Sequence, residues 1–174
     1  MITPTHESTV LKRPAPLSRV ALSFLPAFLI MLAPWGNLWQ SLRPDFMLLL
    51  LLYWTVREPT LIRGRTAFFL GLLADVADST TFGLHALGYT LAHFLAGYYR
   101  TRIQSFYILH QAFHILLLLL LNQVITALAG RLLMYPWPTL MWWLQSPLTA
   151  IFWVLLPTWL ERSSDPGTTT SRRA

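Results

Sequence analysis

The chain has 174 residues, of which 55% are apolar and only 11% are charged, whereas about 25% are charged in typical soluble domains. A water-soluble fold of this size would expose much of that apolar surface, so the composition excludes a soluble globular protein and indicates a lipid environment. The net charge of +6 comes from basic residues scattered at the ends of apolar stretches, which points to membrane topology and contact with membrane lipid and predicts no nucleic-acid binding.

The first predicted elements are a polar cytoplasmic tail, residues 1–16, and an apolar stretch, residues 17–35. The stretch is longer than the apolar core of a signal peptide and has no small-x-small cleavage site at its end. We therefore expect an uncleaved first membrane-spanning helix, in which Pro26 and Pro34 introduce kinks that a packed bundle tolerates.

Two short apolar blocks follow, residues 46–56 and residues 66–77. As helices they would be about 18 Å long, while the hydrocarbon core is about 30 Å thick. One alternative is a re-entrant hairpin, but it would place Arg57, Arg63 and Arg65 near the middle of the membrane, at about 2.5–3.5 kcal/mol each. Two true spans with snorkelling ends or local thinning of the bilayer are favoured.

Three further spans are predicted at residues 83–99, 106–129 and 140–160. The loop 130–138 contains two prolines, which stop helices. Residues 161–174 are polar and are expected to form a cytoplasmic tail. The sequence thus predicts an all-α integral membrane protein of about six short helices, with a transmembrane domain at 17–160.

The distribution of basic residues supports six crossings with both termini in the cytoplasm. Only two basic residues, Arg43 and Arg131, fall in the predicted outside segments. The other eleven fall inside: Lys12, Arg13, Arg19, Arg57, Arg63, Arg65, Arg100, Arg102, Arg162, Arg172 and Arg173. Omitting the second and third spans together would keep this agreement, so the charges alone do not decide between the two arrangements.

Arg43, Pro44 and Asp45 begin the second span. Proline suits the first turn of a helix, and an acidic side chain favours the positive helix N-terminus. These residues predict a helix start with a local ion pair. The alternative is a surface that a partner protein contacts from outside.

Asp75 and Asp78 end the third span on one helical face. We expect their carboxylates to accept hydrogen bonds near the fourth span. A D-x-x-D pair can also hold Mg²⁺ in phosphotransfer enzymes, but further acidic ligands and a basic substrate clamp are missing here.

Small residues recur at every fourth position on the third and fourth spans, which allows two helices to approach closely. The two stripes are Ala67, Gly71 and Asp75, and Gly88, Ala92 and Ala96. They predict a tightly packed pair of helices joined by a turn that ends near Gly83.

Histidines occur in two groups. His85 and His93 flank Tyr89 on the fourth span, where we expect hydrogen bonds between helices, with a ligand pocket as the alternative. His110 and His114 lie at i and i+4 on the fifth span. That spacing can bind zinc, but no third ligand is evident, so polar contacts between helices are the better interpretation. Asn122 and Gln123 lie further along the same span.

Catalytic signatures such as G-x-S-x-G, the P-loop and H-E-x-x-H do not occur in the sequence, and the chain has no cysteine nucleophile. We therefore expect no enzymatic activity, no cofactor and no metal ion.

Four segments, taken in order, resemble the rod shape-determining protein MreD family over about residues 40–100. They are RPDF at 43–46 followed by LLLLLYW, REP at 57–59, FLGLLAD at 69–75 and FGLHAL at 82–87. His85 departs from the resemblance, because asparagine is common there in the family, and a pocket role for that side chain is therefore doubtful.

The resemblance implies a multi-pass protein of the bacterial inner membrane that belongs to the elongation machinery. It implies action with MreC, and through it with MreB, RodA and a class B penicillin-binding protein. It also implies a fold similar to the substrate-binding subunits of vitamin transporters, a likeness that would not transfer a substrate.

Together these observations predict a noncatalytic scaffold that docks MreC and couples cytoskeletal filaments to peptidoglycan synthesis. The residues expected to build its partner-binding or structural face are Arg43, Pro44, Asp45, Gly71, Asp75, Asp78, Gly83, His85, Tyr89 and His93. One alternative is a small-molecule binding or transport subunit with an outward-facing pocket of Asp75, His85, Tyr89 and His93. Another is a membrane phosphotransferase that uses Asp75 and Asp78.

Overall fold

The computed structural model describes residues 16–162, with backbone only at 37, 38, 161 and 162, and every regular element in this range is a helix. The helices of 12 residues or more are α1 (Leu17–Leu32), α3 (Phe46–Arg57), α4 (Gly64–Ala77), α5 (Leu84–Tyr98), α7 (Ile108–Leu132) and α9 (Gln145–Arg162). The shorter ones are α2 (Asn37–Leu42), α6 (Arg100–Gln104) and α8 (Leu140–Trp143). The predicted all-helical class is confirmed.

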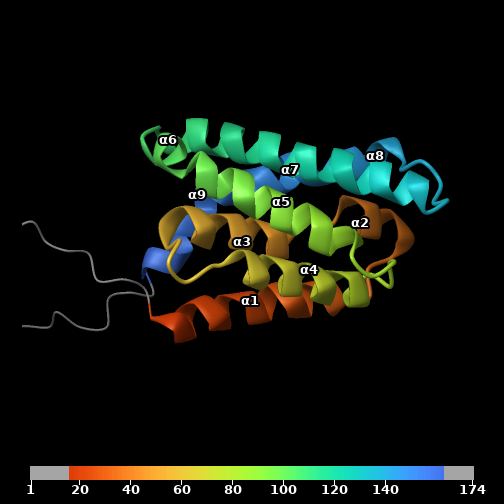
Figure 1. Cartoon of the computed structure of the whole chain (residues 1–174), viewed down its shortest axis with the longest axis horizontal. Helices are drawn as coiled ribbons and strands as arrows, with labels where there is room; N and C mark the ends of the chain where they lie inside the picture. Colours follow the sequence, from red (N-terminus) through yellow and green to blue (C-terminus); the bar gives the residue numbers. More distant parts are fainter. Residues whose placement is uncertain (1–15, 163–174) are drawn as a thin grey trace, which may run out of the picture.

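The six longer helices run back and forth along one axis of the molecule (Figure 1). One end, here called the α2 end, carries α2, α8 and the turn between α4 and α5. The opposite end, called the α6 end, carries α6, the α3–α4 connection, the start of α1 and the end of α9. This alternation brings the polar residues that begin α3 and α5 to the same end as those that finish α4 and α7.

The helix α3 is the centre of the bundle, because every side chain from Met47 to Val56 is buried. A helix that is apolar all round is buried, either inside protein or inside a membrane, and here the neighbouring helices surround it. Its Trp54 indole donates to Ser23 Oγ of α1 at 2.9 Å, and Tyr53 meets Trp153 of α9 edge to face. The neighbouring helices thus cover this short apolar block, and its length does not have to match a bilayer.

The short helix α6 closes the C-terminal end of α3. Arg100 Nε and Gln104 Nε2 both donate to the carbonyl oxygen of Val56, at 2.8 and 2.6 Å. The last carbonyls of a helix lack partners within that helix, so these two side chains satisfy one of them. No pattern in the sequence predicted this helix.

Other boundaries also differ from the sequence-based expectation. The segment between the first two predicted spans contains α2, and α1 ends before Pro34. The predicted sixth span divides at Leu144 into α8 and α9, and α9 continues to Arg162, two residues into the predicted tail. The remainder of both predicted tails lies outside the described residues.

Within residues 16–162, two helical segments are long and apolar enough to cross a membrane, Ile108–Leu132 and Leu140–Leu160, and Leu17–Leu32 is a shorter apolar helix. Large apolar side chains point away from the bundle on several helices, such as Leu29 on α1 and Phe113 on α7. Such a surface would be unusual in water and suits a lipid environment.

Basic residues gather at the α6 end of the described chain. Arg63, Arg65 and Arg102 are exposed there, while Arg43 and Arg131 lie toward the α2 end. The fold therefore separates the arginines as the six-crossing arrangement requires.

Candidate functional site

The carboxylate of Asp75 is the hydrogen-bonding centre of the turn between α4 and α5. It is fully buried and accepts hydrogen bonds from the backbone N–H groups of Gly83 at 2.8 Å and His85 at 2.7 Å. The Nδ1 atom of His85 lies 2.9 Å from Asp75 Oδ1, and the Thr80 hydroxyl donates to the same oxygen at 3.2 Å. Asp75 thus satisfies N–H groups at the start of α5, as expected for a carboxylate near the fourth span.

Gly71 lets α4 and α5 touch through their backbones. A Cβ at this position would collide with Ala86 Cα and would lie 2.6 Å from Ala86 N and 2.8 Å from His85 O. The predicted close pairing of these two helices is therefore present. The partner stripe differs from the prediction, because Gly88 faces Asn122 of α7 instead of α4.

Arg43 forms a buried ion pair with Asp78 at the α2 end, with Nη2 donating to Asp78 Oδ1 at 2.6 Å. Its Nη1 donates to the carbonyl oxygen of Met31, near the end of α1, at 2.8 Å. The predicted local pair with Asp45 is wrong, since the ion pair joins two segments that are 35 positions apart. Arg43 therefore ties α1 and the end of α4 to the start of α3.

Asp45 begins α3 and links it to two other helices. Its Oδ1 accepts from the backbone N–H of Leu48 at 2.9 Å, which is an N-cap bond directly after Pro44. The Tyr89 hydroxyl of α5 donates to the same carboxylate at 2.7 Å, and the backbone N–H of Asp45 donates to Thr149 Oγ1 of α9 at 3.0 Å. The predicted helix start is confirmed.

The polar stripe of α5 makes hydrogen bonds between helices, as expected. His85 contacts Asp75 of α4, Tyr89 contacts Asp45 at the start of α3, and His93 Nδ1 lies 2.9 Å from Thr55 Oγ1 near the end of α3. These bonds explain how polar side chains are accommodated among buried apolar ones.

The histidines of α7 do not match the expectation. His110 is exposed and His114 is half-buried, and His114 Nδ1 lies 2.8 Å from the carbonyl oxygen of His110 in the same helix. Both rings stack on Phe106. The expected contacts to other helices are therefore wrong for this pair, whereas Gln123 does join helices, donating to Trp142 O at 2.8 Å and accepting from the Ser146 hydroxyl at 2.6 Å.

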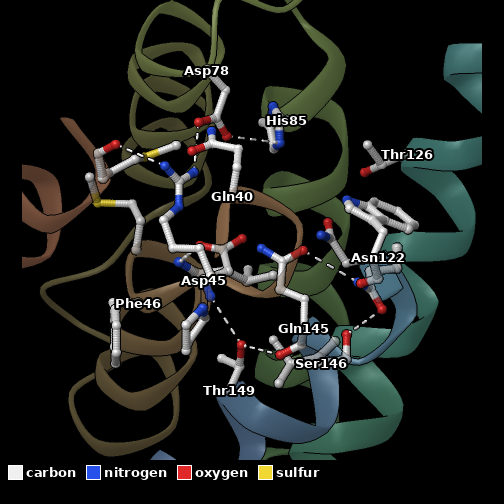
Figure 2. Close-up of a pocket in the computed structure, with 18 of the residues that line it drawn as sticks. Gln40, Asp45, Phe46, Asp78, His85, Asn122, Thr126, Gln145, Ser146 and Thr149 are labelled. Atoms are coloured by element: carbon white, nitrogen blue, oxygen red, sulfur yellow. Dashed lines mark hydrogen bonds and ion pairs between the residues drawn. The ribbon is translucent and has the colours of Figure 1, made fainter. Parts of the chain in front are cut away.

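A cavity of about 320 Å³ lies at the α2 end of the bundle (Figure 2). Five of the predicted residues line it: Arg43, Pro44, Asp45, Asp78 and His85. The other five, Gly71, Asp75, Gly83, Tyr89 and His93, are not part of its lining. Of the four residues predicted for the pocket of a small-molecule subunit, only His85 lines this cavity.

Sequence reasoning missed most of the polar lining, which comes from α2, α7 and α9. These residues are Gln40, Ser41, Asn122, Gln123, Thr126, Gln145, Ser146 and Thr149. A signal was available, because Asn122 and Thr126 in α7, and Gln145 and Thr149 in α9, each stand four apart in otherwise apolar segments. Polar residues at that spacing share one helical face.

In the part of the chain that the structure describes, no group of three or more His, Asp or Glu side chains is placed to hold a metal ion. The site is therefore a cavity bordered by ion pairs and amide groups, and what it offers chemically is hydrogen bonding.

Comparison with known proteins identifies the family. The family profile described as rod shape-determining protein MreD matches residues 15–162. The chain belongs to the MreD family. Members of this family are multi-pass inner-membrane proteins that determine rod shape, which accords with the apolar helices and with the sequence resemblance.

A relative with the same family name supports this assignment. The chain is 41% identical to the rod shape-determining protein MreD of Haemophilus influenzae over 64 residues, which cover 37% of this chain and 40% of that protein. The match thus spans less than half the length of the curated relative. No solved structure matches the chain.

Proposed function

We propose that this protein is a noncatalytic scaffold of the rod-shape machinery that docks MreC and, through it, couples MreB filaments to RodA and a class B penicillin-binding protein. The observation that carries the proposal is that the family's profile covers the whole described bundle, in which the charged residues hold helices together. Asp75 and Asp78, the candidates for phosphotransfer, are occupied by α5 and by Arg43.

The proposed arrangement in the membrane has six crossings, with both termini and the α6 end in the cytoplasm. The exposed arginines at the α6 end support it, because basic residues concentrate on the cytoplasmic side. The α2 end, with its cavity, then faces the periplasm.

Cysteine labelling tests this arrangement, since the chain has no native cysteine. Thr60 in the α3–α4 connection and Trp137 between α7 and α8 are both exposed. In intact cells with a permeabilised outer membrane, an inner-membrane-impermeant maleimide should label the Trp137→Cys variant and leave Thr60→Cys unlabelled until the inner membrane is broken. Labelling of Thr60→Cys from the periplasm would refute the six-crossing arrangement.

We place the docking surface for MreC around the cavity at the α2 end. Arg43 and Asp45 are held by bonds to four other segments, so this wall is rigid and presents a fixed shape. Preorganised surfaces lose little conformational entropy when a partner binds. The predicted face residues that line the cavity lie on this wall.

A tryptophan in the cavity lining tests docking. Ser41 is half-buried, lines the cavity and makes no side-chain hydrogen bond in the described chain, so Ser41→Trp obstructs the cavity without removing an internal bond. Ser105 is exposed at the α6 end, where its hydroxyl donates only to Arg102 O three residues earlier, and Ser105→Trp is the control. In a rod-shaped host depleted of its own MreD, Ser41→Trp should give round cells and lose co-purification of MreC.

The control variant should keep both the rod shape and the partner. If cells with Ser41→Trp stay rod-shaped and retain MreC, the cavity is not the docking surface. If depletion itself leaves the host rod-shaped, the scaffold function is wrong.

A further inference from the structure

The α7 wall of the cavity carries buried polar groups that the protein itself does not satisfy. Asn122 is 7% exposed and Thr126 is 8% exposed. Asn122 Oδ1 and Thr126 Oγ1 have no hydrogen-bond partner among the described residues. Figure 2 shows both side chains on the opposite side of the cavity from Asp45 and Asp78. Buried polar groups are nearly always paired in native proteins, so the unpaired hydroxyl of Thr126 and the incompletely bonded amide of Asn122 in this cavity wall indicate a missing partner.

A close approach between two helices fixes the direction of the Asn122 amide. Its oxygen sits against the Gly88 backbone, where a side chain on residue 88 would have a Cβ. A carbonyl oxygen can accept a weak C–H···O contact from a Cα–H group, whereas an amide NH₂ in that place would find no hydrogen-bond acceptor. The nitrogen of Asn122 is therefore the part of the amide that remains available to an occupant of the cavity.

The charges around the cavity are already engaged. Arg43 is paired with Asp78, Asp45 accepts from Tyr89 and from the start of α3, and His85 contacts Asp75. An anionic ligand would find no spare cation, and a cationic ligand would have to compete with Arg43. Charge burial without a partner is costly, so the occupant has to be uncharged.

Other open hydrogen-bonding groups surround the same space. The side chains of Gln40 and Ser41 make no hydrogen bond within the described chain. The amide oxygen of Gln145 accepts one long hydrogen bond, from Gln123 Nε2 at 3.4 Å. The occupant therefore meets both donors and acceptors. A group that offers an N–H and a C=O together matches such a lining best.

We propose that the cavity binds an uncharged amide, with Asn122 and Thr126 as its hydrogen-bonding wall. The amide comes either from a main-chain segment of a partner protein or from a free small molecule. A cavity of about 320 Å³ lies within the range of small-ligand sites and accommodates a capped dipeptide. The inference concerns the chemistry of the occupant and does not depend on MreC being the source.

Protection of a reporter cysteine by N-acetylglycylglycine amide tests the proposal on the purified full-length protein. Ser41→Cys provides a unique thiol at the cavity lining, and its rate of maleimide modification is measured with and without the dipeptide. The rate should fall about fourfold when the dipeptide is at about three times its dissociation constant, because only the empty fraction reacts.

Three comparisons give the test its specificity. Protection should disappear when Asn122→Leu and Thr126→Val are combined in the reporter protein, or be weakened by Thr126→Val alone if the double variant does not fold. It should persist with Thr158→Val, the same loss of a hydroxyl at an exposed site whose bond stays within α9. Uncapped glycylglycine, with a charge at each end, should protect much less.

Equal protection in the double variant, equal protection by the charged dipeptide, or no protection in the parent would each overturn the proposal. Two further arms identify the source. Slow modification in a complex purified with its partner assigns the amide to a polypeptide, and a small mass released in native mass spectrometry of the isolated protein assigns it to a free molecule. Because no partner is present in the dipeptide experiment, its failure is separate from a failure of the docking proposal.

Discussion

The Gly71→Ala variant should unfold at a clearly lower temperature than the parent protein in detergent micelles, with the free energy of unfolding reduced by about 3 kcal/mol. The added methyl group would meet Ala86 Cα, Ala86 N and His85 O. These atoms belong to a helix backbone, which cannot rotate out of the way as a flexible side chain can. Relief requires α4 and α5 to move apart along their shared face.

The matched control for this variant is Gly97→Ala. Gly97 is also helical, in α5, but nothing lies within 4 Å of the position where its Cβ would be. Alanine there should raise stability by up to about 1 kcal/mol, because it favours the helix more than glycine does. Thermal unfolding followed by circular dichroism compares the two variants, and equal stability of Gly71→Ala and the parent would contradict the close approach seen in the structure.

A larger side chain at the same position extends the argument to function. Gly71→Leu should separate α4 and α5 further. This would shift the end of α4 and the start of α5, where Asp78 and His85 form part of the cavity wall. Under the proposed scaffold function, cells that depend on this variant should become round and lose MreC co-purification. Rod-shaped cells with the partner retained would show that the packing of these two helices is dispensable.

The helical class, most helix positions and the α4–α5 contact follow from the sequence, because each depends on local patterns. Apolar length marks the helices, and a small residue at every fourth position marks a face that another helix can approach. Periodicity identifies residues that share a face but does not say which neighbour that face meets. For Gly88 the sequence therefore predicts the correct kind of contact, a close approach between helices, but the wrong partner helix.

The central position of α3 illustrates a second limit. The sequence of its 12 residues is compatible with a short membrane span and with half of a re-entrant hairpin, because both kinds of segment are apolar. The structure encloses every side chain from Met47 to Val56 in protein, and this outcome depends on α1, α5 and α9 packing around the helix. Tertiary packing of that kind leaves no signature within the segment itself.

One wall of the candidate site could be predicted from the sequence, and the opposite wall could not. Arg43, Asp45 and Asp78 attract notice because charges near lipid are costly, and all three line the cavity. The opposite wall consists of uncharged residues of α7 and α9, such as Asn122 and Thr149, which alone suggest nothing more than contacts between helices. Only the closure of the bundle brings the two walls together, across up to 104 positions in the case of Asp45 and Thr149.

The Asp75→Asn variant should be the second strongly destabilised one, with the free energy of unfolding reduced by about 3 kcal/mol. The carboxylate uses both oxygens, one for the N–H of Gly83 and the other for the N–H and ring nitrogen of His85. An asparagine of the same shape has only one acceptor, so its NH₂ group must face a buried N–H group that then has no partner. The loss of negative charge at the start of α5 also removes a favourable interaction with the helix dipole.

Asp78→Asn is the same chemical change three residues further on and separates this effect from the general loss of a carboxylate. Asp78 is 17% exposed and pairs with Arg43. The remaining amide oxygen can still accept the bond from Arg43, but the buried guanidinium loses its counter-charge, so the cost should be about 1–3 kcal/mol and should fall on the contacts of Arg43 instead of on the start of α5. Thermal unfolding of both variants in detergent gives the comparison, and hydrogen exchange should show faster opening at the start of α5 in Asp75→Asn only. If hydrogen exchange at the start of α5 is equally fast in the two variants, Asp75 does not hold the α4–α5 turn, and the wall of the cavity that contains His85 depends on packing instead of on this carboxylate.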